Sequence, residues 1–113
     1  MTQNPNLVRG TLDLLILKSL TWEPRHGYGV SEWIETVTDG SLLMEEGTLY
    51  PALHRLRGKG WIESEWGLSD NNRRAKYYRL TREGARHLAR ESDTWMRYTS
   101  AVARALALES PTP

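Results

Sequence analysis

Apolar residues recur at intervals of three and four in two stretches near the start of the chain, and this spacing predicts two helices. The first stretch covers residues 9–22, where Leu14 and Leu17 lie off the main apolar stripe, so this helix should be buried on more than one side. The second helix is predicted over about residues 27–37, and its apolar face consists of Val30, Trp33, Ile34 and Val37. The bridge between the second and third helices, residues 41–46, can add one short strand.

A third helix is predicted over residues 48–58, although a proline stands among its apolar positions. With Thr48 as the N-cap, Pro51 is the third helical residue, where an N–H would have no intrahelical partner. We therefore expect Pro51 to mark the beginning of this helix without the loss of a hydrogen bond, and Gly58 to mark its end. The side chains that face away from the apolar stripe, or flank it, are Tyr50, His54, Arg55 and Arg57.

Residues 61–68 and 75–80 alternate between apolar and polar side chains, which predicts two strands. Between them lies the polar turn "SDNNRRA", so the pair should form a β-hairpin with a basic tip. Thr81 is the expected N-cap of a long final helix, with Glu83 near its positive end. Apolar steps continue to Leu106 and, together with the first helix, present more apolar surface than so small a domain can cover, so we expect a coiled-coil-like contact between two copies.

The chain has 113 residues, of which 39% are apolar and 26% charged, as in one ordinary globular domain. It contains no cysteine, which excludes a disulfide framework, a thiolate metal site and a cysteine nucleophile. Its three histidines share no ligand spacing, and we find neither a nucleophile elbow nor a Gly-rich phosphate loop. We therefore expect no metal, no cofactor and no enzymatic activity. Neither a signal peptide nor a membrane-spanning run is evident, so a cytoplasmic protein is expected.

Charge is unevenly distributed along the chain, although the net charge is only +1. Residues 1–47 carry 3 basic and 7 acidic side chains, whereas residues 48–80 carry 7 basic and 3 acidic ones. A local basic zone in a nearly neutral chain indicates a binding site for an anionic partner rather than a general affinity for polyanions.

Three helices, a two-stranded hairpin and a long last helix predict a mostly α (α+β) fold of the winged helix-turn-helix type. In this layout the outward face of the third helix enters the major groove, where base edges can be distinguished. The arginines of the wing then reach phosphates or the minor groove. The expected organisation is a winged-helix DNA-binding domain (1–80), a C-terminal dimerisation helix (81–108) and a disordered tail (109–113).

The stretches "EGTLYPALHRLRGKGWI" and "RRAKYYRLTREG" strongly resemble the PadR-like transcriptional regulators, as do "GTLDLLILKSL" and "HGYGV" nearer the start. The resemblance runs from about Leu7 to Leu108, and the single last helix is similar to the compact branch of that family. It implies a homodimer that binds double-stranded DNA at an inverted-repeat operator and, usually, repression relieved by a small molecule. Arg57 stands where an acidic residue is common. Gly29 stands where a longer residue is common, so we expect the helix at residues 27–37 to begin less firmly.

The resemblance and the basic hairpin tip together suggest roles for particular positions. The expected DNA contacts are Tyr28, Thr48, Tyr50, His54, Arg55, Lys59, Arg73, Arg74 and Lys76. The family also implies a slot in which a tryptophan of the last helix faces its symmetry mate and sandwiches flat aromatic compounds. Candidates for this effector slot are Leu12, Asp13, Leu15, Trp95 and Met96. The expected dimer contacts are Leu88, Trp95, Val102 and Leu106.

Plainer interpretations are open for several of these residues. Tyr50 can be a half-buried side chain that covers the edge of the core, and His54 can simply be solvated. Trp95 can serve dimer packing alone, and Asp13 can be explained by the dipole at the beginning of the first helix. For the whole protein, the alternative is a winged-helix module that binds protein or RNA without an operator of its own. The polar and basic outward face of the third helix favours nucleic acid.

Overall fold

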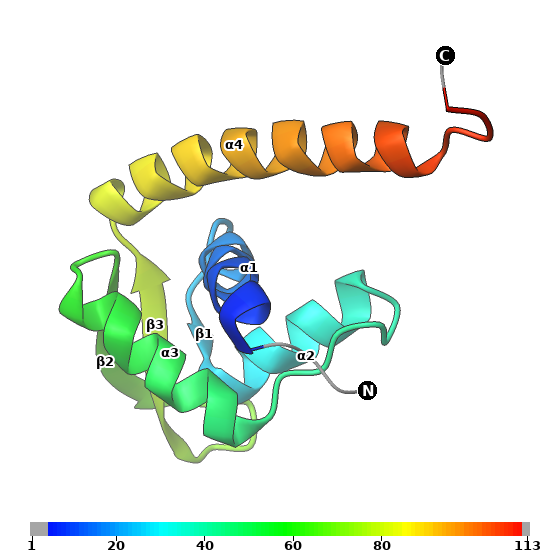
Figure 1. The fold of residues 1–113 in the computed structure, drawn as a ribbon. Coiled ribbons are helices and arrows are strands. Elements are labelled where there is room, and N and C mark those ends of the chain that lie inside the picture. Colours follow the sequence, from blue (N-terminus) through cyan, green and yellow to red (C-terminus); the bar gives the residue numbers. More distant parts are fainter. Residues whose placement is uncertain (1–4, 112–113) are drawn as a thin grey trace.

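The computed structural model describes the backbone of residues 5–111, with side chains from residue 10 onward (Figure 1). It confirms the mostly helical α+β architecture, with a hairpin wing and a long last helix. Residues 1–4 of the predicted DNA-binding domain and the last two residues of the predicted tail lie outside the described range. The elements of the described part are α1 (Pro5–Ser19), β1 (Arg25–His26), α2 (Gly27–Val37), α3 (Glu46–Gly58), β2 (Ile62–Leu68), β3 (Arg74–Leu80) and α4 (Arg82–Leu106).

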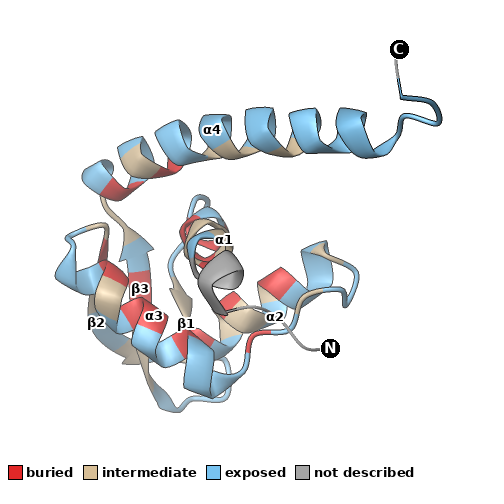
Figure 2. Ribbon diagram, in the orientation of Figure 1, coloured by how far each residue is buried: buried red, intermediate tan, exposed pale blue. Residues whose placement is uncertain are grey.

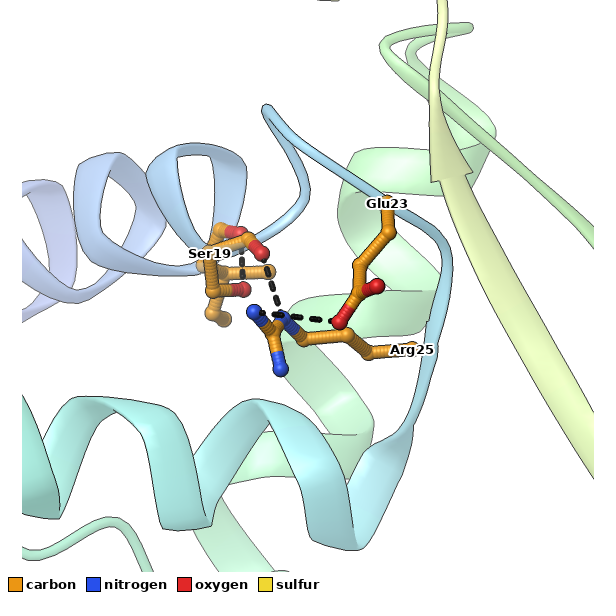
Figure 3. A network of polar contacts seen from close by, with 4 residues as sticks. Ser19, Glu23 and Arg25 are labelled. Carbon is orange, nitrogen blue, oxygen red and sulfur yellow. Dashed lines mark hydrogen bonds and ion pairs between the residues drawn. The ribbon is translucent and has the colours of Figure 1, made fainter. Parts of the chain in front are cut away.

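Helix α1 begins earlier than predicted and ends at Ser19, so the prediction that it reaches Trp22 is wrong. Its last turn is closed by Arg25, whose Nε donates to the Ser19 carbonyl oxygen at 2.7 Å (Figure 3). The Ser19 hydroxyl donates to the Ile16 carbonyl at 2.6 Å, and a Glu23 carboxylate oxygen lies 3.6 Å from the guanidinium. Side-chain donors therefore satisfy carbonyl groups that another helical turn would have satisfied.

Helix α2 has the predicted bounds, and its first turn is capped. The Nδ1 of His26 accepts a hydrogen bond from the Gly29 N–H at 3.0 Å. The expectation that Gly29 weakens the beginning of this helix stays a prediction, although this cap satisfies the N–H of the glycine itself. Val30 and Ile34 are buried, whereas Val37, in the last turn of the same face, is exposed.

The sheet contains three antiparallel strands in the order β1–β3–β2 among the described residues. The hairpin β2–β3 is the predicted wing, and at its tip the Ser69 carbonyl accepts from the Asn72 N–H at 2.8 Å. The third strand, β1, precedes α2, and the suggestion of a strand in the bridge at residues 41–46 is wrong. A strand of two residues is too short to show an alternating pattern of apolar and polar side chains. It forms only through pairing with Tyr77 and Tyr78 of β3.

One apolar core lies between the first three helices and the sheet (Figure 2). Helix α1 packs against each of the other helices, which confirms that it is buried on more than one side. The core is therefore built around α1. Its buried residues are Leu12, Ile16, Leu17, Leu20, Val30, Ile34, Met44, Leu49, Ala52, Leu53, Leu56, Ile62, Tyr78 and Leu88.

Helix α4 joins the rest of the molecule at its beginning, against the wing root, which consists of Gly60 and Trp61. Thr81 caps the helix as predicted, since its Oγ1 accepts from the Gly84 N–H at 3.0 Å while the hydroxyl donates to the Gly60 carbonyl at 2.7 Å. Gly84 lies so close to the wing root that a Cβ would be 2.0 Å from the Trp61 carbonyl oxygen. The rings of Trp61 and His87 stack at 3.6 Å, so the orientation of α4 is fixed here.

The rest of α4 extends away from the other elements, and most of its later turns are exposed (Figure 2). The molecule measures 59 × 30 × 23 Å and has a radius of gyration of 16.2 Å. A compact chain of this length would have a radius of gyration of about 13 Å. The difference reflects a 25-residue helix that is roughly 37 Å long. None of the described helices combines the length and the apolar character that a membrane span requires.

Candidate nucleic-acid interface

Helix α3 begins earlier than predicted, and the assignment of Thr48 as its N-cap is wrong. The N-cap is Glu45, whose carbonyl accepts the N–H groups of Thr48 and Leu49 at 2.9 and 2.8 Å. A threonine side chain is the stronger sequence signal for a cap, but here the cap acts through its backbone alone. Pro51 therefore lies inside the helix, and it does cost a hydrogen bond, since the N–H of any other residue at this position would have reached the carbonyl of Gly47.

The beginnings of α2 and α3 lie close together at Gly27, because glycine has no side chain that would keep them apart. A Cβ on Gly27 would lie 2.6 Å from the Tyr50 hydroxyl oxygen, so glycine allows Tyr50 to lie against the first turn of α2. Tyr28 is exposed nearby, and both tyrosines line the same open space. Two phenol groups and the N–H groups at a helix start thus gather in one place, which suits a phosphate group.

This space is an open groove of about 900 Å³ between the beginnings of α2 and α3 and the wing. Its lining contains three basic side chains, all from the wing, and two acidic ones, Glu32 and Asp70. The groove is therefore aromatic and, on balance, cationic, which suits the backbone of a nucleic acid. The predicted DNA-contact residues that line it are Tyr28, Tyr50, Arg73, Arg74 and Lys76.

Tyr78 connects this groove to the core, because it lines the groove although it is itself buried. Burial raises the pKa of its hydroxyl above the ordinary value. Tyr50 adds to the rise of this pKa, whereas Arg57 opposes it. Tyr78 therefore remains a neutral hydroxyl at physiological pH.

Two further lining residues, Trp66 and His26, have no role in the predicted site. Trp66 pairs with Lys76 across the wing, and its ring centroid lies 4.4 Å from Arg74 Cζ and 5.3 Å from Lys76 Nζ. The alternation along β2 was a usable signal for Trp66, because the register of a hairpin decides which side chains are opposite each other. His26 gave only a weak signal, that of a polar residue directly before an apolar helix.

The other predicted contact residues lie outside the groove lining. Thr48 and His54 are exposed on α3, so the exposed side of α3 and the groove together form the candidate interface. Lys59 follows the end of α3, and its Nζ lies 4.7 Å from the centroid of the Trp61 ring.

Arg55 turns away from this interface and forms an ion pair with Asp13 of α1. The side chain of Arg55 is 30% exposed and that of Asp13 only 14%. The Arg55 Nε is buried and has no hydrogen-bond partner among the described residues. Asp13 is the ninth residue of α1, so its explanation by the dipole of the first turn is wrong. The ion pair instead connects α1 to α3.

The residues predicted for the effector slot and the dimer are divided between core and surface. Leu12 and Leu88 are buried in the protomer's own core. Leu15 and Trp95 are half-buried, and the ring centroid of Tyr98 lies 6.3 Å from that of Trp95. The remaining predicted effector and dimer residues, all exposed on α4, are Met96, Val102 and Leu106.

Among residues 5–111, no three histidine or carboxylate side chains gather as metal ligands would.

Comparisons with known proteins agree with this geometry. A family model described as the transcriptional regulator PadR-like family matches residues 16–90. A solved transcriptional regulator from Clostridium thermocellum is 31% identical with a TM-score of 0.78, over 88% of this chain and 96% of that one. A PadR family transcriptional regulator from Eggerthella lenta is 35% identical with a TM-score of 0.73, over 92% of this chain and 88% of that one. An uncharacterized protein from Lysinibacillus sphaericus is 37% identical over 91 residues, which cover 80% of this chain and 83% of that protein.

Proposed function

This chain belongs to the PadR-like family of transcriptional regulators, and we propose that it is a homodimeric repressor that binds an inverted-repeat operator and is released by a small, flat aromatic effector. Membership of this family implies DNA binding and makes the protein a regulator rather than an enzyme. The observation that carries the proposal is the groove, where tyrosines at two helix starts lie opposite the cations of the wing.

In the proposed complex, the exposed side of α3 faces base edges in the major groove. The tyrosines of the groove and the start of α2 hold a phosphate, and the cations of the wing reach the neighbouring backbone. Arg55 is left out of this set because it is engaged by Asp13. The proposed contacts are Tyr28, Thr48, Tyr50, His54, Lys59, Arg73, Arg74 and Lys76.

The proposed dimer joins two copies of the C-terminal helix, with residues 1–80 as the DNA-binding domain and residues 81–108 as the dimerisation helix. An amphipathic helix that projects alone into water is marginal, so the exposed apolar residues of α4 support burial against a second copy. Two grooves related in this way would meet half-sites about 34–36 Å apart on one side of the DNA. Beyond the half-buried Trp95, the proposed dimer contacts are Val102 and Leu106.

The proposed effector slot lies on the dimer axis, where Trp95 faces its symmetry mate. Met96 and Leu15 are its proposed neighbours, whereas Leu12 belongs to the core and Asp13 is occupied by its ion pair. A flat aromatic compound between the two Trp95 rings would change the distance between the α4 helices. It would thereby shift the population toward dimers whose grooves no longer match the half-sites.

A salt-titrated binding assay tests the DNA-binding part of this proposal. Duplex DNA from upstream of the protein's own gene is compared with a shuffled duplex of the same composition. We expect a clear preference for the upstream DNA, and a log–log salt slope that decreases by about 0.9 for each phosphate contact removed. The variant Arg73→Gln/Arg74→Gln should reduce both affinity and slope. The matched control Arg86→Gln/Arg90→Gln removes two exposed charges from α4 and should change neither.

Equal, weak and salt-sensitive binding to both duplexes would contradict an operator and would favour a winged-helix module that acts through a protein partner. The effector is tested by the fluorescence of the wild type against Trp95→Phe during titration with flat aromatic compounds. We expect quenching that is lost in Trp95→Phe, together with weaker operator binding. A compound that binds at Trp95 and leaves operator affinity unchanged would refute the release mechanism.

A further inference from the structure

Trp66 occupies a place in the wing that burial does not explain. The residue is 57% exposed, although tryptophan is the largest apolar residue. Successive residues of a strand point to opposite faces, so Trp66 shares a face of the sheet with Ile62, which is buried. The face that covers the core near the wing root therefore continues, toward the tip, as one wall of the groove.

Two cations of the groove are held against the Trp66 ring. Lys76 is its direct cross-strand partner, and Arg74 lies two residues further along the same face of β3. The ring centroid lies 4.4 Å from Arg74 Cζ and 5.3 Å from Lys76 Nζ, within the range of a cation–π interaction. Long basic side chains otherwise lose considerable rotamer freedom when they are fixed at a phosphate.

We propose that Trp66 is a positioning residue for DNA binding, which orders Arg74 and Lys76 in the groove before the DNA arrives. This inference rests on the proposed function and adds to it a residue that carries no charge and is not required to touch the DNA. The ring contacts favour the ordered arrangement of each cation and leave its charge available to phosphate oxygens. A cation–π contact at an exposed site shifts an equilibrium by about two- to five-fold. Loss of both contacts should therefore weaken operator binding by about 4- to 25-fold.

The chain offers a matched control for this inference. Trp22 is also exposed, at 64%, and Lys18 Nζ lies 5.0 Å from the centroid of its ring. It does not line the groove. Trp22→Leu and Trp66→Leu thus remove a similarly exposed tryptophan from a cation–π contact, outside and inside the proposed interface respectively.

The experiment measures operator affinity and its salt slope for the full-length protein and these variants, with circular dichroism and thermal unfolding as checks of folding. We expect Trp66→Leu to weaken binding by the stated factor and to lower the salt slope toward that of Arg74→Gln/Lys76→Gln. Trp66→Phe keeps an aromatic face and should recover part of the affinity, while Trp22→Leu should match the wild type. When Trp66→Leu is added to Arg74→Gln/Lys76→Gln, it should have no further effect, because the cations through which it acts are gone.

Two results would overturn this role for Trp66. One is wild-type affinity of Trp66→Leu. The other is a weakening that persists unchanged in the Arg74→Gln/Lys76→Gln background, which would show that the ring acts independently of the cations. Failure of the proposed function itself has a different appearance, since the wild-type protein would then show no preference for operator DNA.

Discussion

Replacement of Asp13 by asparagine should lower the free energy of unfolding by about 2 kcal/mol. Removal of one partner from a fully buried ion pair costs about 3–5 kcal/mol, because the other charge stays buried without compensation. The value here is reduced to about 2 kcal/mol because 30% of the Arg55 side chain is exposed to solvent. The substitution should lower the melting temperature by about 8 °C and the urea midpoint by about 1 M. Far-UV circular dichroism at one fixed protein concentration measures both quantities.

The same chain contains the control for this experiment. Arg97 and Asp93 form an exposed i,i+4 pair on α4, with 2.8 Å between the charged atoms, and Asp93→Asn should cost less than about 0.5 kcal/mol. The double variant Asp13→Leu/Arg55→Met replaces both charges by apolar groups and should be more stable than Asp13→Asn. The reasoning is refuted if Asp13→Asn costs no more than Asp93→Asn, or if the double variant is no more stable than Asp13→Asn.

The double variant also separates two roles of Arg55. If Arg55 acts only by connecting α3 to α1, as its contact with Asp13 indicates, the folded double variant should keep the salt slope of the wild type. A slope lower by about 0.9 would mean that Arg55 leaves Asp13 for a phosphate in the complex and contacts DNA after all.

Three further outcomes are expected. Gly84→Ala should destabilise the protein by about 3 kcal/mol or more in thermal unfolding, because its Cβ would lie 2.0 Å from the carbonyl oxygen of Trp61, which is part of the backbone and cannot move aside. Gly27→Ala should cost little stability, since its Cβ meets the mobile end of Tyr50, but it should weaken operator binding in the duplex assay by displacing that hydroxyl. The raised pKa of Tyr78 gives stability that is complete below about pH 10 and decreases as pH rises through the folded pKa; Tyr78→Phe should make this alkaline decrease smaller in urea titrations at several pH values.

The elements that the sequence predicted correctly are those with a strong local signal. Helix α2 has a regular apolar stripe between two glycine-containing turns, and the wing has two alternating stretches around a polar turn. Helix α4 begins where Thr81 provides a capping side chain. Each of these signals lies within a few residues of the element that it predicts, so a single sequence is sufficient to predict these elements.

Several of the errors occur where a residue outside the element decides the outcome. Helix α1 ends at Ser19, whose carbonyl accepts a hydrogen bond from Arg25, although the apolar pattern continues. The strand β1 exists only because β3 pairs with it. Asp13 and Arg55, 42 residues apart, had been assigned to an effector slot and to DNA, but they contact each other. The flank of a helix on which a long side chain lies is visible in the sequence, whereas the partner toward which it turns is a property of packing.

The attachment of α4 determines what a movement between two α4 helices can do to the proposed DNA interface. The beginning of α4 is fixed to the wing root through Gly84 and the stacked ring of His87, so a displacement of α4 carries the wing with it. Helix α4 also packs on α1, and α1 holds α3 through the ion pair of Asp13 with Arg55. The two walls of the groove, the wing and the beginning of α3, are therefore attached to the same helix by two separate routes. In the proposed dimer, a ligand between the α4 helices would consequently move each groove as a rigid unit. It would change the distance between two intact grooves rather than the shape of either one, and an operator with two half-sites at fixed spacing is sensitive to this distance.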